Sequence, residues 1–375
     1  MAIQVQETRD DFQQARDAFQ ERFTGMAIES LEAASIYIGT QLGYYAVLFE
    51  LGPLSASELA QRTGTHERYT REWLEQQTIS GIVELAPESV ELPGELRQFL
   101  LPEAHRDLLV RPDEEHRMGE VSGFVTALTS LVLQTPAVID AFLTGGGVPF
   151  ESYGVACVHG VDGMNPNADD DPLPNEWIPA MPDVHQRLLA DPPARVADVG
   201  CGGGKALIAL AQHYPKLQAD WFDLDPTSVE LARRNAERAG VANRVHFHCV
   251  DAAELGDRHG YDLVMPIACV HDMAYPVRAL RAMRVMAGDG GTVFVADPLL
   301  DPFVGQTGER SDRFAYAASV LHCLPVSMVF DSSAGTGCAM KEATLRDYAA
   351  EAGFSDVEIL PIERTGFLGY FRLTP

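Results

Sequence analysis

The sequence predicts a mainly helical domain followed by an α/β domain that is built on a mostly parallel sheet. From about residue 195 onward, short apolar runs alternate with helical patterns, which is typical of a parallel sheet with helices on both faces. A cluster of glycines follows the first apolar run, and the length of 375 residues is more than one core usually needs. The last segment, 354–373, predicts two antiparallel strands. The other strands are expected near residues 195–199, 220–222, 245–249, 263–267 and 292–296.

Composition and charge narrow the class of protein. Hydrophobic residues make up 46% of the chain and its formal net charge is −26, which disfavours nucleic-acid backbones and anionic membranes as partners. No apolar run reaches the roughly 18 residues that cross a membrane, and the charged, polar start does not look like a secretory signal. The six cysteines have no zinc-binding spacing. We therefore expect a cytoplasmic protein with a small-molecule substrate.

The amino-terminal region predicts helices followed by a small winged module. Residues 10–51 have a helical pattern, and the part over 31–51 has apolar side chains on nearly all sides, as expected of a helix in a core or a dimer. They are followed by a short helix ending at Gly64 and a second helix over 67–77. The segment 81–93 then predicts a two-stranded wing with Pro87 in its turn.

This order of elements resembles a winged helix-turn-helix, which allows two interpretations. A winged helix binds DNA by placing its second helix in the major groove. In the predicted second helix, however, Arg68 and Arg71 are outnumbered by three glutamates, at positions 67, 72 and 75. We therefore favour a dimerisation and scaffolding domain over residues 1–102, in line with the negative charge of the whole chain.

Residues 103–190 predict a helical connector that also serves as a substrate lid. It holds an apolar helix broken near Pro136 and two segments rich in glycine, proline and aspartate, 143–154 and 165–182. Loops of this length in a compact chain are usually lids or binding segments. Ordinary packing is the alternative for each of the candidate substrate-binding residues, Tyr153, His159 and Trp177.

A strand, a glycine cluster and a helix follow one another in residues 196–215. A P-loop would need glycine in place of Val199 and a hydroxyl in place of Ala206. The dinucleotide motif G-x-G-x-x-G would end on Lys205 instead of a small residue. The pattern D-x-G-x-G-x-G is matched in full, by Asp198, Gly200, Gly202 and Gly204. An acid inside the motif suits a ligand with an ammonium group better than a pyrophosphate.

This stretch resembles motif I of the class I S-adenosylmethionine (SAM)-dependent methyltransferases. The resemblance implies a Rossmann-like sheet with a reversed final hairpin over residues 191–375, SAM as the cofactor, and Asp198 toward the ammonium end of SAM. The resemblance covers about 195–375 well and the amino-terminal half more loosely. The overall arrangement resembles small-molecule O-methyltransferases of a bacterial branch, which carry a winged-helix dimerisation domain and include enzymes of secondary metabolism. A homodimer is therefore expected.

Acidic residues follow the second and third predicted strands. Asp223 lies about 20 residues past the last glycine of the motif, where an acid can accept both ribose hydroxyls. Asp225 precedes a proline and is expected instead to cap the next helix. The methyltransferase resemblance implies that Asp251 binds the adenine amino group and that Ala252 packs near the ring. Leu224 is grouped with the cofactor-binding residues.

The fourth strand is followed by His271 and Asp272. This pair is similar to the H-D-[W] segment of plant-type small-molecule O-methyltransferases, in which the histidine is the general base; here Met273 replaces the tryptophan. A hydroxyl must lose its proton as it attacks the methyl group, and imidazole, with an ordinary pKa of about 6.5, accepts protons near neutral pH. A neighbouring carboxylate would orient the ring.

A second histidine leaves alternatives open. His322 lies in an apolar, helix-like stretch, and with His271 and Asp272 it resembles the metal-binding set of α-keto acid C-methyltransferases, in which a metal polarises the keto acid. Otherwise, His322 is a core histidine or a second acid/base group. We predict that these three residues form a catalytic set without a metal. Metal-dependent C-methylation is one alternative, and a SAM-sensing transcription regulator that binds DNA through its winged helix is another.

Overall fold

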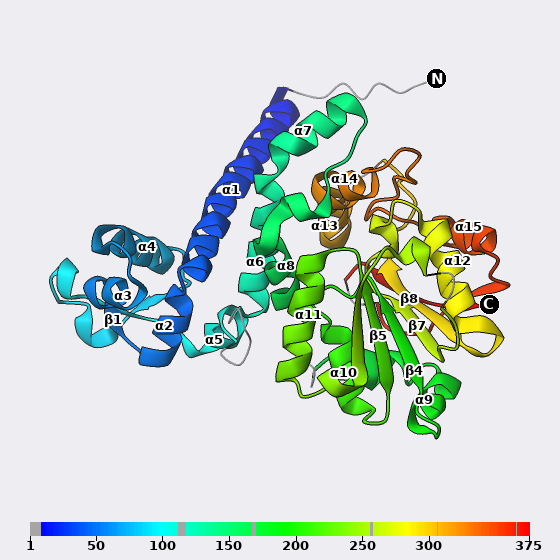
Figure 1. The fold of residues 1–375 in the computed structure, drawn as a ribbon. Helices are drawn as coiled ribbons and strands as arrows, with labels where there is room; N and C mark the ends of the chain where they lie inside the picture. Colours follow the sequence, from blue (N-terminus) through cyan, green and yellow to red (C-terminus); the bar gives the residue numbers. More distant parts are fainter. Residues whose placement is uncertain (1–8, 112–117, 167–169, 256–257, 306, 365) are drawn as a thin grey trace. The chain divides into compact units, whose positions relative to one another are not determined.

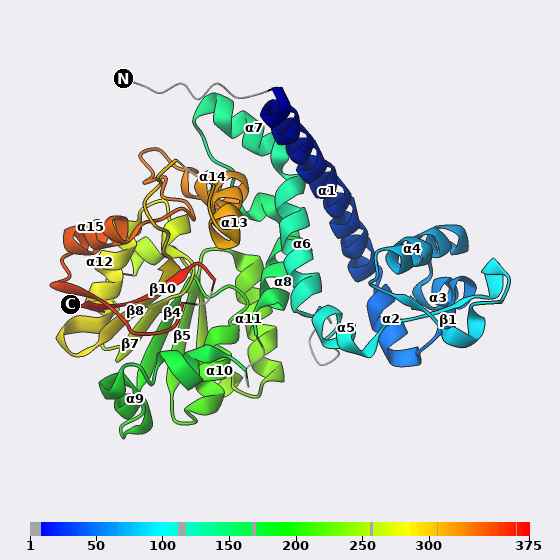
Figure 2. The ribbon, with the colours of Figure 1, turned by 180° about the vertical axis from the view of Figure 1, so that it is seen from behind.

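The computed structural model divides into two compact units, Met1–Thr129 and Ser130–Pro375, whose elements are labelled in Figures 1 and 2. The residues it describes are 9–111, 118–166, 170–255, 258–305, 307–364 and 366–375. The expected connector, 103–190, is shared between the two units. The division of the chain into three parts therefore stays a prediction.

The amino-terminal unit is mainly helical, as predicted. Its helices are α1 (Arg9–Gln41), α2 (Tyr44–Leu51), α3 (Ala56–Thr63), α4 (Glu67–Ile79) and α5 (Glu103–Leu109). Ser55 caps α3: its hydroxyl accepts the Glu58 N–H, and the Glu58 carboxylate accepts the Ser55 N–H. Gly64 ends the same helix in a left-handed conformation, with φ of 69°. Residues 10–51 form two helices because Gly43, also left-handed, separates α1 from α2.

A three-stranded antiparallel sheet completes the winged module. Its strands are β1 (Leu54–Ser55), β2 (Glu84–Leu85) and β3 (Gln98–Leu100), in the order β1-β3-β2. The predicted wing was wrong in its second strand, because β2 pairs with β3 and not with residues 88–93. Pro87 begins a short 3-10 turn over Pro87–Ser89, where a fixed φ and a missing N–H take the chain out of the ladder. The Ser89 hydroxyl accepts the Gln98 N–H at 3.0 Å and holds the returning strand in place.

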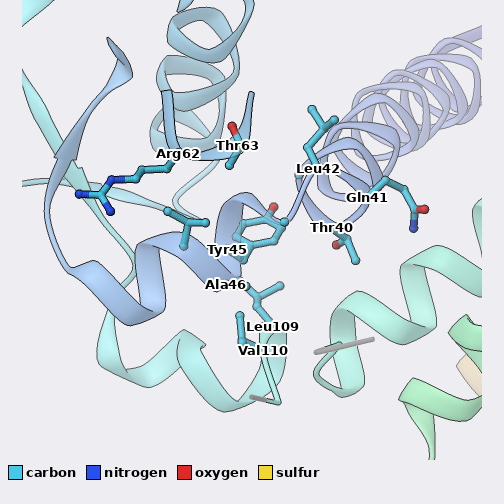
Figure 3. Close-up of a pocket in the computed structure, with 12 residues that line it drawn as sticks. Thr40, Gln41, Leu42, Tyr45, Ala46, Arg62, Thr63, Leu109 and Val110 are labelled. Atoms are coloured by element: carbon cyan, nitrogen blue, oxygen red, sulfur yellow. The ribbon is translucent and has the colours of Figure 1, made fainter. Parts of the chain in front are cut away.

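The core of this unit is aromatic. Trp73 packs edge-on against Tyr44 and Tyr45, with ring centroids 4.7 and 5.3 Å apart. A cavity of about 370 Å³ opens beside Tyr45, between the end of α1, the start of α2, the end of α3 and the residues after α5. Figure 3 shows Tyr45 and Ala46 among the 12 residues that line it. Arg62 is the one charged side chain in that lining, which includes none of the predicted site residues.

A bent pair of helices follows in the sequence. α6 (Glu120–Leu133) and α7 (Thr135–Thr144) meet at an angle of 48°, which confirms the predicted break near Pro136. Pro136 lies in the first turn of α7, where its missing N–H leaves no helical hydrogen bond unmade. Within the described ranges, no single helix is long and apolar enough to cross a membrane, although this bent pair passes that test by length and composition.

The carboxyl-terminal unit is built on a seven-stranded sheet (Figure 1). Its strands are β4 (Arg195–Val199), β5 (Gln218–Asp223), β6 (Val245–Cys249), β7 (Leu263–Pro266), β8 (Thr292–Pro298), β9 (Asp356–Ile359) and β10 (Leu368–Thr374). Their order is β6-β5-β4-β7-β8-β10-β9. The five predicted strands and the antiparallel final pair are confirmed. β10 lies between β8 and β9 and runs antiparallel to both, so β10 alone is the reversed strand.

Helices cover both faces of this sheet, as an α/β pattern predicts. One face packs against α9 (Pro182–Leu189), α10 (Lys205–His213) and α11 (Pro226–Arg238), and the other against α12 (Pro276–Ala287) and α15 (Glu342–Ala352). Neighbouring residues of β4 point to opposite cores: Val196 contributes to the first and Ala197 to the second. From β4 the chain adds β5 and β6 on one side of the sheet and then β7 and β8 on the other. The order of the strands therefore reverses between β4 and β7, and open α/β sheets bind ligands at such a point.

The expected loops of the connector contain more helix than predicted. The segment 143–154 passes through a 3-10 turn, Phe150–Tyr153, into α8 (Gly154–Met164), a helix that was not predicted. The segment 165–182 contains a π-helical turn, Leu173–Trp177, and its positions 167–169 lie outside the described residues. Farther along, α13 (Arg310–Ala318) continues through a second π-helical turn, Ser319–Cys323, into α14 (Leu324–Ser327).

Candidate functional site

The glycine cluster forms a tight turn between β4 and α10. Gly200, Gly202 and Gly204 all have left-handed φ values. A side chain at Gly204 would strike the Trp221 ring, 2.6 Å from an added Cβ, whereas an added Cβ at Gly202 would meet nothing within 4 Å. Gly204 therefore serves the packing of helix against sheet, and Gly202 leaves an open side on which a ligand can approach the backbone.

Asp223, at the end of β5, closes this turn. One oxygen of its carboxylate accepts the Gly202 N–H at 2.9 Å, and the other accepts the Asp225 N–H at 2.9 Å. Asp225 does the work expected of a cap: its carboxylate accepts the N–H and the hydroxyl of Ser228 at 2.7 and 2.8 Å, at the start of α11. Two acids separated by one residue thus have different roles, as predicted. The contact of Asp223 with a ribose stays a prediction.

The acids around the turn favour a cationic ligand. Asp198 is 2% exposed, and its burial, together with the negative charge of Asp223, raises its pKa to about 8. Burial also raises the pKa of Asp223, against the backbone N–H groups that stabilise its charge. A positive charge bound nearby would lower both values, whereas a phosphate would raise them further. The residues present therefore fit SAM, which carries a sulfonium and an ammonium group.

Asp251 follows the neighbouring strand at the same edge of the sheet. β5 and β6 pair in parallel up to Asp223 and Cys249. Asp223 at the end of β5 and Asp251 just after β6 therefore lie at adjacent strand ends. The Asp251 carboxylate accepts the Ala253 N–H at 2.8 Å and caps a 3-10 turn over Ala252–Glu254. Of the other two predicted cofactor residues, Leu224 is 61% exposed and Ala252 packs against the sheet core. Their contact with SAM stays a prediction.

His271 lies directly after β7, in a 3-10 turn over Val270–Asp272. Its Nδ1 is 2.5 Å from an oxygen of Asp297, and the other oxygen of Asp297 accepts the Val270 N–H at 2.8 Å. Asp297 is fully buried, near the end of β8. No motif in the sequence pointed to Asp297. Its signal was an acid directly after the apolar predicted strand 292–296, because an acid requires a partner when it is buried.

The second nitrogen of His271 also has an acidic neighbour. Nε2 lies 3.2 Å from Oδ1 of Asp272. Burial lowers the pKa of His271, but the negative charges of Asp272 and Asp297 outweigh burial and raise it to about 10. The two carboxylates therefore favour the protonated imidazole of His271. Its role as a general base stays a prediction.

His322 has the opposite environment. It lies in the π-helical turn Ser319–Cys323, an irregularity that is frequent at functional sites. Its Nε2 is buried and has no hydrogen-bond partner among the residues that the structure describes. Burial lowers the pKa of His322, Asp272 opposes this, and His271 lowers it further. The ring packs edge-on against Tyr153 at 4.6 Å. The lowered pKa favours the neutral form of His322.

Cysteines join the two histidines. Ligand atoms of Asp272, His322 and Cys323 lie within 4.8 Å of one another, and so do those of His271, Cys323 and Cys338. The predicted metal-binding set of the alternative, His271 with Asp272 and His322, is not among these groups. The sequence did not point to the cysteines, because their spacing matches no metal motif.

The three predicted substrate residues have different surroundings. Tyr153 is buried beside His322, and its hydroxyl donates to the Leu321 carbonyl at 2.7 Å. His159 is half-buried on α8. Trp177 packs in the core on the α10 face, with its ring 4.8 Å from that of Tyr370. The structure thus brings Tyr153 to the histidine pair, whereas packing accounts for Trp177.

Comparison with known families decides the class of the carboxyl-terminal unit. Residues 196–291 match a family described as a methyltransferase domain, and residues 31–111 match one described as the Rv2258c-like winged HTH domain. Residues 196–291 thus carry a methyltransferase domain. The winged module precedes this methyltransferase domain along the chain, in the arrangement that the sequence predicted.

Solved structures of methyltransferases share the fold over nearly the whole chain. Human N-acetylserotonin methyltransferase in complex with SAM is 15% identical with a TM-score of 0.65, covering 100% of this chain and 99% of that chain. The mitomycin 7-O-methyltransferase is 20% identical with a TM-score of 0.63, covering 96% and 99%. An N,N-8-amino-8-demethyl-D-riboflavin dimethyltransferase from Streptomyces davawensis is 18% identical with a TM-score of 0.60, covering 95% and 98%. At these identities the likeness shows the fold.

Curated relatives match about a third of this chain. The tRNA1(Val) (adenine(37)-N6)-methyltransferase of Yersinia pestis is 32% identical over 131 residues, which are 33% of this chain and 46% of that protein. The chain thus spans about half the length of the curated relatives it matches. Because the match covers less than half of that protein, its activity is not transferred to this chain.

Proposed function

We propose that the protein transfers a methyl group from SAM to a small-molecule acceptor, at a hydroxyl group, with His271 as the general base. The observation that carries this proposal is the arrangement along one edge of the sheet. An open glycine turn is joined to Asp223, and His271 follows β7 with Asp297 on its Nδ1 atom. The first part suits a cationic nucleoside, and the second holds an imidazole in one orientation.

SAM supplies an electrophilic methyl group on a sulfonium. The residues proposed to hold it are Asp198 for the ammonium group, the glycine turn for the methionine backbone, Asp223 for the ribose, and Asp251 with Leu224 and Ala252 for the adenine. Asp223 already accepts two backbone N–H groups, so its carboxylate is held in place before any ligand binds. Such preorganisation reduces the ordering that binding would otherwise require.

His271 is proposed to remove the proton of the acceptor hydroxyl through Nε2. Asp297 on Nδ1 fixes the tautomer in which Nε2, the nitrogen beside Asp272, is the basic one, and it stabilises the charged ring once the proton has moved. Because the raised pKa keeps His271 protonated near neutral pH, the reactive neutral form becomes more abundant as the pH rises. Turnover is therefore expected to increase from neutral toward alkaline pH. Holding nucleophile and methyl group in line supplies much of the remaining acceleration.

The test compares SAM binding with turnover. Wild-type protein should bind SAM in isothermal titration calorimetry and form S-adenosylhomocysteine with a panel of hydroxylated acceptors. His271→Ala should bind SAM with the same Kd and turn over about 100- to 10,000-fold more slowly. The control is His246→Ala, at an exposed histidine of β6. Failure of the wild type to bind SAM overturns the proposed function, and unchanged turnover of His271→Ala overturns the base assignment.

A metal-dependent C-methylation is the second candidate. The observation that favours it is a pair of buried atoms, Nε2 of His322 and Oδ1 of Asp272, for which the described part of the chain provides no hydrogen-bond partner. With the Cys323 sulfur they form a set of nitrogen, oxygen and sulfur donors, which suits a transition metal. About one metal ion per chain in the purified protein, lost in His322→Ala, would support this reading. Full turnover after chelator treatment would rule it out.

The partners of the protein are also proposals. We propose a homodimer through α1, because Phe12, Phe19, Phe23 and Met26 fall on one helix face at spacings of seven, four and three and are exposed. Nucleic acid is disfavoured because the two arginines of α4 pair with glutamates of the same helix, Arg68 with Glu72 and Arg71 with Glu67. The cytoplasmic location and a role in secondary metabolism stay predictions.

A further inference from the structure

The glycine turn contains one glycine that its motif does not require. Gly203 occupies a variable position of D-x-G-x-G-x-G, yet an added Cβ there would lie 2.0 Å from Oδ1 of Asp162. Asp162 belongs to α8, and its side chain is nearly buried. The carboxylate of a connector helix therefore rests directly on the backbone of the cofactor turn. This close approach accounts for the glycine at position 203.

Two further side chains tie Asp162 to the turn. Asn235, on α11, donates from its Nδ2 atom to Oδ1 of Asp162 at 3.1 Å and to the Gly203 carbonyl at 2.8 Å. Lys205, the first residue of α10, has its Nζ atom 3.8 Å from Oδ2 of Asp162. The lysine that gave the sequence a partial P-loop pattern is thus the counter-ion of a buried carboxylate. Asp162, Lys205 and Asn235 together form what we call the turn clamp.

The other end of the same helix reaches the histidine pair. α8 begins directly after Tyr153, which donates to the Leu321 carbonyl and packs against the ring of His322. Eleven residues of helix therefore connect the surroundings of His322 with the glycine turn. A helix of this length transmits a displacement at one end to the other, because its backbone hydrogen bonds keep it rigid.

We propose that Asp162 is a positioning residue for SAM. It acts through the glycine turn, whose backbone it holds at Gly203 while Asn235 and Lys205 hold the carboxylate. The clamp keeps the turn in its binding conformation, and it fixes the helix that begins beside Tyr153 and His322. Loss of the clamp leaves the fold intact and weakens the binding of SAM, because the turn must then be ordered during binding.

A double-mutant cycle on SAM affinity tests this proposal. Asp162→Ala and Gly203→Ala should each raise the Kd of SAM about tenfold: the first releases the turn, and the second places a methyl group where the carboxylate lies. The Kd of the double variant should not exceed the higher Kd of the two single variants, because removal of the carboxylate makes room for the methyl group. Such coupling is typical of residues in direct contact. Asp162→Asn, which keeps an acceptor for Asn235 but loses the charge facing Lys205, should fall between wild type and Asp162→Ala.

The matched control is Asp171→Ala. Asp171 is as buried as Asp162 and lies in the same connector, but it accepts the N–H of Leu173. Both alanine variants should lower the unfolding temperature, and only Asp162→Ala should change the Kd of SAM well below that temperature. A Kd within twofold of wild type for Asp162→Ala, or effects that multiply in the double variant, would overturn the proposal. The inference rests on the proposed SAM site, and absence of SAM binding in the wild type would overturn the proposed function itself.

Discussion

Two parts of the sheet edge are built by different kinds of contact. The cofactor edge, formed by the glycine turn, Asp223 and Asp251, is held by carboxylates that accept backbone N–H groups. The acceptor side, formed by His271, Asp297, Tyr153 and His322, is held by side chains from segments far apart in the sequence, such as His271 with Asp297 and Tyr153 with the Leu321 carbonyl.

This difference determines how each part responds to substitution. A carboxylate that accepts backbone N–H groups has its position set by the nearby chain, so changes at the acid, at the glycines or at the clamp that holds the turn disturb it. In the acceptor side, each charge sets the protonation of its neighbours: Asp272 and Asp297 raise the pKa of His271, and His271 in turn lowers that of His322. A single substitution there is expected to change the pKa values and protonation states of its neighbours while the fold stays intact.

The largest effect is expected at the cofactor edge, from Asp223→Ala. The variant loses the acceptor of the Gly202 N–H and the proposed acceptor of two ribose hydroxyls. Charge-assisted hydrogen bonds contribute about 1.5–3 kcal/mol each, so the Kd of SAM should rise by about 100-fold or more, measured by isothermal titration calorimetry. A Kd within a factor of three of wild type would show that the ribose binds elsewhere.

A smaller effect is expected at the acceptor side, from Asp297→Asn. Loss of this charge lowers the pKa of His271, so the pH of half-maximal turnover should move down by about one unit or more. Maximal turnover should fall about tenfold, because the ring loses the partner that fixes its tautomer. The Kd of SAM should not change. An unchanged pH profile in Asp297→Asn would mean that His271 is not the group that titrates.

The same charge pair predicts how stability depends on pH. The folded-state pKa of His271 is raised from the ordinary 6.5 to about 10, so protonated His271 stabilises the folded protein fully below pH 6.5. That contribution is lost as the pH rises through about 10. The free energy of unfolding, measured by urea denaturation, should therefore fall between these values in the wild type and fall less in Asp297→Asn. An equal slope in both proteins would contradict the assignment.

Most of the cofactor edge could be predicted from the sequence because its contacts are local. The glycine turn belongs to one strand–turn–helix unit, and a parallel sheet brings the residues after neighbouring strands to the same edge. Asp225 could be told from Asp223 because Pro226 follows it, and its cap of α11 is observed. The second strand of the wing was also misplaced for a local reason. The apolar residues that follow Pro87 have a strand pattern, but the strand that pairs with β2 is β3.

The acceptor side could be predicted only in part, because it depends on packing between distant segments. The H-D pair was visible after the fourth strand, but Asp297, Cys323 and Cys338 reach it through β8, a π-helical turn and the loop before α15. Nothing in the spacing of these residues indicates that their side chains meet. The contact of Asp162 with Gly203 could not be predicted for the same reason. Asp162 lies in α8, a helix that was not predicted because a glycine-rich segment precedes it.

The smallest effect tests the contrast within the cofactor edge itself, two residues beyond Asp223. Asp225→Ala removes the cap of α11, where the carboxylate accepts the Ser228 N–H and hydroxyl. Loss of an N-cap costs about 1 kcal/mol, so the free energy of unfolding in urea should fall by that amount. Because the Asp225 backbone N–H remains, Asp223 keeps both of its contacts, and the Kd of SAM should stay within twofold of wild type. A large loss of SAM affinity in Asp225→Ala would show that the cap and the ligand site are one unit, and that a carboxylate at this edge acts through the helix it starts as well as through the ligand it faces.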